Sequence, residues 1–205
     1  MKFKLLLCGF LALLVSATVF AQPPAGEKFS ALQNAVILII RHAEKPDSGS
    51  GLSAYGEARA KAYVKYFENF TNTVDGRPLK ISYLFAAADS MGSHRPRLTI
   101  TPTSQALGLA IDSRFKDKNF RELANEIQSK PHGRAILIAW HHGEIPSLLR
   151  AFGVDVETVI PKARWPEDVF GWVIELRYDA DGRLVEASRI NEKLLPDDLN
   201  KHAEK

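Results

Sequence analysis

Short apolar runs punctuate this chain at intervals. Residues 36–40 and 135–140 are continuously apolar, and residues 81–88 are mostly apolar. A run of this length that gives way to turn-forming or polar residues predicts a strand buried on both faces, as in the interior of a parallel sheet. The sequence therefore predicts at least three central strands.

Four helices are predicted between and after these runs. Apolar side chains recur every three or four positions in residues 52–67, 119–129 and 145–152. Ser53 is suited to cap the first of these helices. A further helix is expected to begin at Arg95, because Pro96 fits a first helical turn, and Pro102 is expected to bend or restart it.

The last two apolar segments form a hairpin pattern. Residues 171–178 and 184–190 flank an Asp-Ala-Asp-Gly sequence at residues 179–182, which predicts antiparallel strands at one side of the sheet. Strands that alternate with helices predict an α/β fold, here a three-layer αβα sandwich with a mostly parallel central sheet. Right-handed crossovers make the carboxyl ends of the parallel strands meet at one edge.

The N-terminal segment resembles a secretory signal peptide. Lys2 and Lys4 precede an apolar run over residues 5–20, and small residues at the expected positions predict cleavage near Ala21. We therefore expect residues 1–21 to be removed and residues 22–205 to form a single domain in the periplasm or outside the cell. The alternative is an uncleaved membrane anchor, but the run is shorter than the ~20 residues that a spanning helix needs.

The charge balance argues against two classes of partner. The formal net charge is +3, and two of these units belong to Lys2 and Lys4 of the predicted signal peptide. A mature chain this close to neutral lacks the basic surplus of nucleic-acid-binding and membrane-surface proteins. The single cysteine, Cys8, lies in the signal segment, so the mature chain would fold without a disulfide.

Histidines and arginines stand where the predicted strands end. Arg41 and His42 follow the first strand, His141 follows the strand at residues 135–140, and Arg95 opens a helix. Ligand sites in open α/β sheets lie at this edge. Guanidinium groups match phosphoryl oxygens, and a neutral imidazole can accept a phosphoryl group on nitrogen. Together these residues favour phosphoryl-transfer chemistry, which requires mainly positioning and positive potential.

Four ordered motifs resemble those of the histidine phosphatase (phosphoglycerate mutase-like) superfamily. They are residues 41–44 (RHAE), 52–60 (LSAYGEARA), 93–99 (SHRPRLT) and 141–146 (HHGEIP). The resemblance spans nearly the whole mature chain and implies the phosphoglycerate mutase-like fold, a small phosphorylated substrate and no cofactor or metal.

The resemblance also implies roles for individual residues. His42 would be the nucleophile that becomes phosphohistidine, and Arg41 and Arg95 would bind the phosphoryl group with His141. Arg95 is preferred to Arg97 because the family's threonine follows four positions after the arginine, as Thr99 follows Arg95. His141 is preferred to His142 because the family's histidine lies five positions before a proline or arginine, here Pro146.

Some assignments stay open at this point. Arg41 and His42 could form a strand-end ion pair with Glu44, and His141 with His142 could be a transition-metal pair. The general acid that protonates the leaving oxygen matches no residue cleanly. Glu44, Asp89 and Glu144 qualify by proximity along the chain, and His142 could support the site.

The expected function is that of an exported phosphomonoester hydrolase that works without metal through a phosphohistidine on His42. A narrower alternative is a phosphatase for an envelope sugar phosphate, such as one in lipopolysaccharide. A third alternative is a non-catalytic phosphate- or anion-binding protein. Three loops, at residues 47–51, 89–94 and 154–168, are expected to set the specificity.

Overall fold

Six strands form one mixed sheet. The structure is a computed structural model that describes residues 31–71, 76–196 and 198, so the predicted signal peptide lies outside the described residues. The strands are β1 Val36–Arg41, β2 Tyr83–Ala86, β3 Ile111–Asp112, β4 Ala135–Trp140, β5 Trp172–Tyr178 and β6 Leu184–Asn191. None of the helices in the described residues combines the length and apolarity needed to cross a membrane.

The strand order is β3-β2-β4-β1-β5-β6. Neighbours from β3 to β1 run parallel, whereas β5 is antiparallel to both β1 and β6. The predicted hairpin is thus confirmed, because β5 and β6 add antiparallel strands to one side of a parallel sheet. Within the described residues, all strands belong to this sheet.

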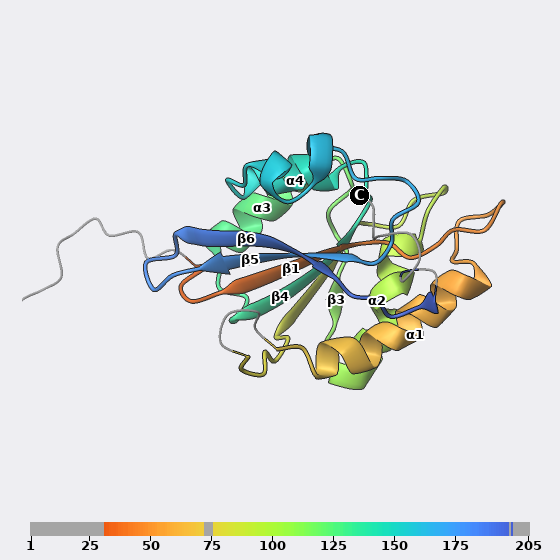
Figure 1. Ribbon diagram of the computed structural model, residues 1–205, viewed down its shortest axis with the longest axis horizontal. Coiled ribbons are helices and arrows are strands. Elements are labelled where there is room, and N and C mark those ends of the chain that lie inside the picture. The colour runs from red at the N-terminus through yellow and green to blue at the C-terminus, as the bar shows by residue number, and fades with distance from the viewer. Residues whose placement is uncertain (1–30, 72–75, 197, 199–205) are drawn as a thin grey trace, which may run out of the picture.

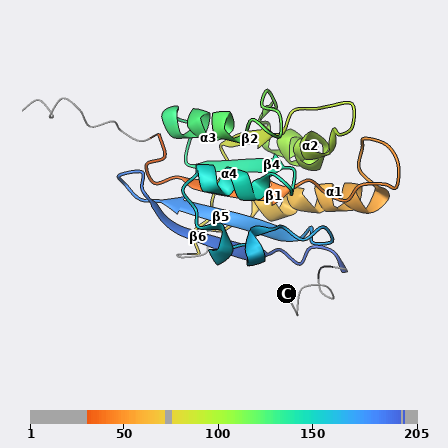
Figure 2. The same cartoon turned by 90° about the horizontal axis from the view of Figure 1, so that it is seen from above.

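Helices cover both faces of the sheet, as Figures 1 and 2 show. They are α1 Ala54–Glu68, α2 Arg95–Leu107, α3 Phe120–Ser129 and α4 Ile145–Ala151, with two short 3-10 helices, η1 Val156–Thr158 and η2 Pro161–Ala163. One core contains residues of α1 and α2, and the other contains residues of α3 and α4. This arrangement is the predicted three-layer αβα sandwich.

Local sequence signals explain several boundaries. The Ser53 side chain accepts a hydrogen bond from the Gly56 amide and caps α1, as expected. Gly56 is required there because a Cβ would meet the backbone of Glu44. The predicted restart at Pro102 is wrong, since α2 continues through this residue to Leu107. A proline inside a helix removes one backbone hydrogen bond and crowds the carbonyl four residues earlier, but the packing of α2 against α1 and the sheet supports the rest of the helix.

Side chains of β1 and β4 alternate strictly between the two cores. Ile37 and Ile39 belong to the core with α3 and α4, whereas Val36, Leu38 and Ile40 belong to the core with α1 and α2. Successive side chains of a strand point to opposite faces, so this alternation continues to the residues that follow. It therefore determines which site residue projects to which face.

Candidate active site

The β1–β4 register brings His42 beside His141. These strands are parallel with Arg41 opposite Trp140, and the His42 amide donates to the Trp140 carbonyl at 2.9 Å. The next residue of each strand therefore meets its neighbour on the same face. The two imidazole rings lie 5.2 Å apart between centroids, with their planes inclined by 67°. The predicted convergence of these distant histidines is present in the structure.

A hydrogen bond to the backbone orients the His42 imidazole. Its Nδ1 lies 2.7 Å from the carbonyl oxygen of Ala43, and since a carbonyl only accepts, Nδ1 carries the proton. The lone pair is then on Nε2. Burial is the main cause that lowers the pKa of His42 to about 3; the charges of Arg41, His141 and Arg95 act in the same direction, and the hydrogen bond to Ala43 opposes them. The imidazole is therefore neutral across the physiological range.

Thr99 connects the segment that follows β1 to helix α2. Its hydroxyl accepts from the Ala43 amide at 2.8 Å and donates to the Arg95 carbonyl at 2.8 Å. Thr99 is fully buried. Thr99 lies four positions after Arg95 in the helix, and its hydroxyl reaches both the Arg95 carbonyl and the amide that follows His42.

Arg95 lies half-buried at the start of α2. Its Nη1 lies 3.4 Å from the Gly49 carbonyl, and the His94 amide donates to Ser50 at 2.9 Å. Loops 47–51 and 89–94 therefore meet beside this residue. Burial lowers the pKa of Arg95, and its charge in turn lowers the pKa values of His42 and His141.

Arg41 projects to the opposite face from His42, as the alternation requires. Its guanidinium lies 3.8 Å above the ring of Phe170 and donates from Nη2 to His142 Nδ1 at 3.3 Å. Nη1 donates at 2.9–3.1 Å to three carbonyls, those of Pro166, Glu167 and Val169. Burial lowers the pKa of Arg41 to about 10, so it stays charged. Arg41 thus anchors the end of the predicted 154–168 loop, a contact that sequence reasoning did not foresee.

The three carboxylates considered as general acids, Glu44, Asp89 and Glu144, have different surroundings. Glu44 is not paired with Arg41 as the alternative reading supposed, because Arg59 binds both its oxygens at 2.7–3.1 Å. Asp89 binds Arg97 at 2.6 Å on the exposed surface. Glu144 is half-buried and precedes α4.

A buried ionic cluster around Arg59 was missed. Besides Glu44, this arginine binds Glu192 at 2.7 Å and Asp198 at 2.8 Å, and Tyr63 donates to Glu192 at 3.0 Å. Burial disfavours the charge of Arg59, but hydrogen bonds to Asp198 and Glu44 raise its pKa above the usual value. Burial raises the pKa of Glu192 to about 8 although Arg59 opposes the shift.

Asp117 was also missed. Burial lowers the pKa of His141, and the strongest opposing influence is the negative charge of Asp117. The Trp140 indole donates to the Asp117 carbonyl at 3.1 Å, which ties this loop to the end of β4. No periodic sequence pattern indicates that this loop carboxylate lies near His141. Its position depends on β3, a two-residue strand that the sequence did not predict.

The histidine pair is a poor metal site. Arg41 keeps its proton, so it donates to His142 Nδ1, and a cation at that nitrogen would face a guanidinium. Burial lowers the pKa of His142 to about 4, with the Arg41 charge as the next cause. In the part of the chain that the structure describes, no three His, Cys, Asp or Glu side chains cluster as metal ligands would.

A cavity of about 380 Å³ adjoins His142 on the face of α4. Ser147 and Arg150 line it from α4, and Arg164 and Trp165 line it from the segment that follows η2. Its lining includes His142 but not His42, His141 or Arg95.

Comparison with known proteins bears on the fold. No protein-family model and no curated protein matches the sequence. Phosphoglycerate mutase from Plasmodium falciparum superposes with a TM-score of 0.50 at 18% identity, over 75% of this chain and 88% of that chain. The chain has a phosphoglycerate mutase-like fold. The predicted fold class is thereby confirmed.

Two further solved structures match this chain with lower TM-scores. The putative phosphohistidine phosphatase SixA from Agrobacterium tumefaciens has a TM-score of 0.48 at 15% identity, over 75% of this chain and 97% of that chain. A mycobacterial glucosyl-3-phosphoglycerate phosphatase has a TM-score of 0.43 at 13% identity, over 77% and 97%. At such identities the activity must be argued from the site itself.

Proposed function

We propose that this protein is an exported phosphomonoester hydrolase that acts through a phosphohistidine at His42. The observation that carries the proposal is the buried, neutral His42 imidazole, whose Nδ1–H is held by Ala43 and whose ring lies 5.2 Å from that of His141. Export rests on the predicted signal peptide at residues 1–21, and metal independence rests on the resemblance stated above.

The proposed reaction has two steps. In the first, His42 Nε2 attacks phosphorus, an N–P bond forms, and the bond to the leaving oxygen breaks as that oxygen takes a proton. In the second, water attacks phosphorus and gives a proton to the group that protonated the leaving oxygen, the N–P bond breaks, and phosphate leaves with His42 and that group restored. Arg95 and His141 would donate to the equatorial oxygens, where charge redistributes in the transition state. Arg41 would contribute positive potential from the opposite face.

Glu44 and Asp89 are poor choices for the general acid because both are bound to arginines. We therefore propose that Asp117 or Glu144 supplies the proton. The test is to compare Asp117→Asn and Glu144→Gln on two substrates, p-nitrophenyl phosphate and an alkyl phosphate. An aryl leaving group needs little protonation, so loss of the acid should reduce alkyl phosphate hydrolysis far more than aryl phosphate hydrolysis.

The activity itself is tested with p-nitrophenyl phosphate in the presence and absence of a chelator. We expect turnover that the chelator leaves unchanged and that His42→Ala abolishes. Turnover that requires a metal ion contradicts the mechanism. Tight vanadate binding without turnover on any phosphomonoester supports the non-catalytic alternative instead.

A further inference from the structure

The Arg59 cluster reaches the backbone that orients His42. The Ala43 carbonyl, which lies 2.7 Å from His42 Nδ1, belongs to the peptide unit that joins Ala43 to Glu44. A peptide unit is planar and moves as one body, so a rotation at Glu44 would turn this carbonyl away from the imidazole. Whatever fixes Glu44 therefore also fixes the acceptor that holds the proton of His42.

Glu44 is held both at its backbone and at its carboxylate. Its carbonyl accepts from the Ser53 amide at 2.9 Å, and Gly56 lies so close to its backbone that a Cβ would not fit. Arg59 Nε lies 3.0 and 3.1 Å from the two carboxylate oxygens, and Nη2 lies 2.7 Å from Oε1. Because two nitrogens of one planar group bind the carboxylate, the contact fixes its direction as well as its distance.

The segment that follows β6 holds Arg59 from the other side. Nη1 donates to Glu192 at 2.7 Å and to Asp198 at 2.9 Å, and Nη2 also donates to Asp198 at 2.8 Å. The side chains of all three residues are buried. All three nitrogens of the guanidinium are thus engaged, and the guanidinium is a fixed support for Glu44.

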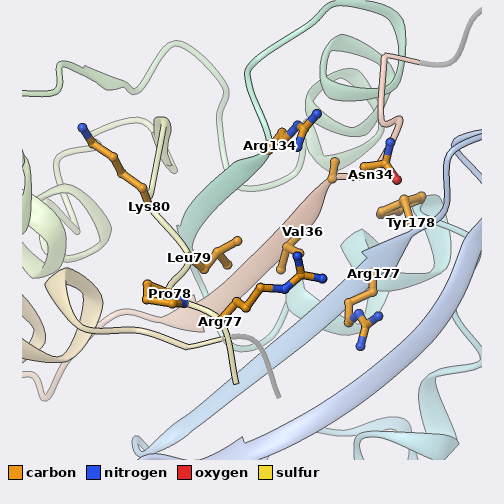
Figure 3. Close-up of a pocket in the computed structure, with 10 residues that line it drawn as sticks. Asn34, Val36, Arg77, Pro78, Leu79, Lys80, Arg134, Arg177 and Tyr178 are labelled. Carbon is orange, nitrogen blue, oxygen red and sulfur yellow. The ribbon is translucent and has the colours of Figure 1, made fainter. Parts of the chain in front are cut away.

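Stability alone does not account for so many buried charges. Taking ions out of water costs free energy that their mutual attraction offsets only in part, and apolar residues of similar volume are often at least as stable. Neither the cavity of about 590 Å³ at the start of β1 (Figure 3) nor the cavity beside His142 is lined by a residue of the Arg59 cluster. A ligand in either cavity would therefore not meet these charges. What the cluster provides beyond apolar packing is a fixed direction for Glu44.

We propose that Arg59 is a positioning residue for the reaction at His42, because its hold on Glu44 keeps the Ala43 carbonyl on His42 Nδ1 and leaves the lone pair of Nε2 available to phosphorus. Thr99 supports the peptide before Ala43 through its amide, whereas Arg59 supports the peptide after it. The effect on turnover rests on the proposed function, but the effect on the His42 tautomer can be measured without a substrate.

The test combines nitrogen-15 NMR spectra of histidine-labelled protein at pH 7 with kcat and KM for p-nitrophenyl phosphate. The His42 signals are assigned by their loss in His42→Gln. Glu44→Ala removes the link to the backbone after β1 but leaves Arg59 its bonds to the segment after β6. We expect the single Nδ1–H tautomer of His42 to become a mixture of tautomers, and kcat to fall at least fivefold while KM stays within twofold.

Glu126→Ala is the matched control. The Glu126 side chain on α3 is 13% exposed and binds Arg114 at 2.8 Å, much as the Glu44 side chain is 15% exposed and binds Arg59 at 2.7 Å. The control therefore removes a comparable ion pair without touching the segment after β1. It should leave the His42 tautomer unchanged and kcat within twofold.

Arg59→Lys tests whether the arginine acts through Glu44. Lysine keeps the buried positive charge but replaces the two-nitrogen contact by a single point of contact. Alone, it should mix the His42 tautomers as Glu44→Ala does, and added to Glu44→Ala it should change kcat by less than a further twofold. If Glu44→Ala fails to fold, Glu44→Gln keeps one acceptor oxygen for Arg59 and should give a smaller change in the same direction.

Three outcomes overturn the proposal. They are an unchanged His42 tautomer in Glu44→Ala or its Gln substitute, an equal change in Glu126→Ala, and a further large loss of kcat when Arg59→Lys is added to Glu44→Ala. Mixed tautomers in Glu44→Ala, found together with a wild-type protein that hydrolyses no phosphomonoester, would support the positioning and contradict the proposed hydrolysis. The two claims therefore fail separately.

Discussion

The Thr99 bridge can be tested with one methyl-for-hydroxyl exchange and a control in the same helix. Thr99→Val keeps the shape of the side chain but removes the acceptor for the Ala43 amide and the donor to the Arg95 carbonyl. Thr103 is also fully buried in α2, but its hydroxyl has no hydrogen-bond partner among the described residues. The two substitutions therefore remove the same atoms from similar surroundings and differ in the hydrogen bonds lost.

The expected magnitudes follow from this difference. Thr99→Val leaves the buried Ala43 amide unsatisfied, which should lower the free energy of unfolding by about 1–3 kcal/mol, whereas Thr103→Val should be neutral or slightly stabilising. The carbonyl of the same residue, Ala43, orients the His42 imidazole. A loss of about 1.4 kcal/mol of transition-state stabilisation corresponds to about tenfold in kcat, so we expect a decrease of roughly that size in Thr99→Val alone.

Urea unfolding and p-nitrophenyl phosphate hydrolysis measure both effects. The reasoning is refuted if the two valine variants have the same stability and the same kcat. A decrease in stability without a decrease in kcat would leave the bridge as a structural feature and refute its role in positioning His42.

Three further predictions concern charge. Because burial lowers the pKa of His42 to about 3, the unfolded chain binds more protons than the folded chain between pH 3 and about 6.5, so stability falls on acidification through this window. Urea unfolding measures the free energy of unfolding at pH 6.5 and at pH 4, and His42→Gln should reduce the difference between these two values by up to about 3 kcal/mol. The same dependence of the free energy of unfolding on pH in the variant and in the wild type would contradict the assigned burial of His42. Arg59→Ala should lower the free energy of unfolding by about 3–5 kcal/mol because it leaves buried carboxylates without their partner. Arg97→Ala, at an exposed ion pair, should lower it by less than about 1 kcal/mol. Equal decreases in melting temperature for the two variants would refute the distinction. Arg95→Ala should raise the vanadate dissociation constant at least tenfold, and Arg97→Ala serves as the control that should leave it within twofold.

Much of the fold could be predicted because its signals are local. The apolar runs of β1 and β4 and the Ser53 cap of α1 each depend on neighbouring residues. The strand β3 has only two half-buried residues and carries no periodic pattern, so it was missed. Pro102 shows the limit of a local rule, since tertiary packing maintains a helix that the rule would interrupt.

The site was predicted in part for the same reason. The meeting of His42 and His141 follows from strand ends that lie at one edge of a parallel sheet. The alternation of β1 would also have assigned Arg41 and His42 to opposite faces, but the three carbonyls that bind Arg41 lie 125–128 residues away in a loop. The Arg59 cluster joins Glu44 to Glu192 and Asp198, and no pattern along the chain relates such distant carboxylates.

Trapping the covalent intermediate tests the central claim most directly. The protein would be mixed with p-nitrophenyl phosphate, quenched in alkali within one turnover, digested and analysed by mass spectrometry. The account predicts a phosphoryl group on His42 that is stable to base, labile to acid and absent from His42→Ala, with His141 unlabelled. Turnover without any phosphorylated peptide, or a phosphoryl group on a residue other than His42, would contradict it.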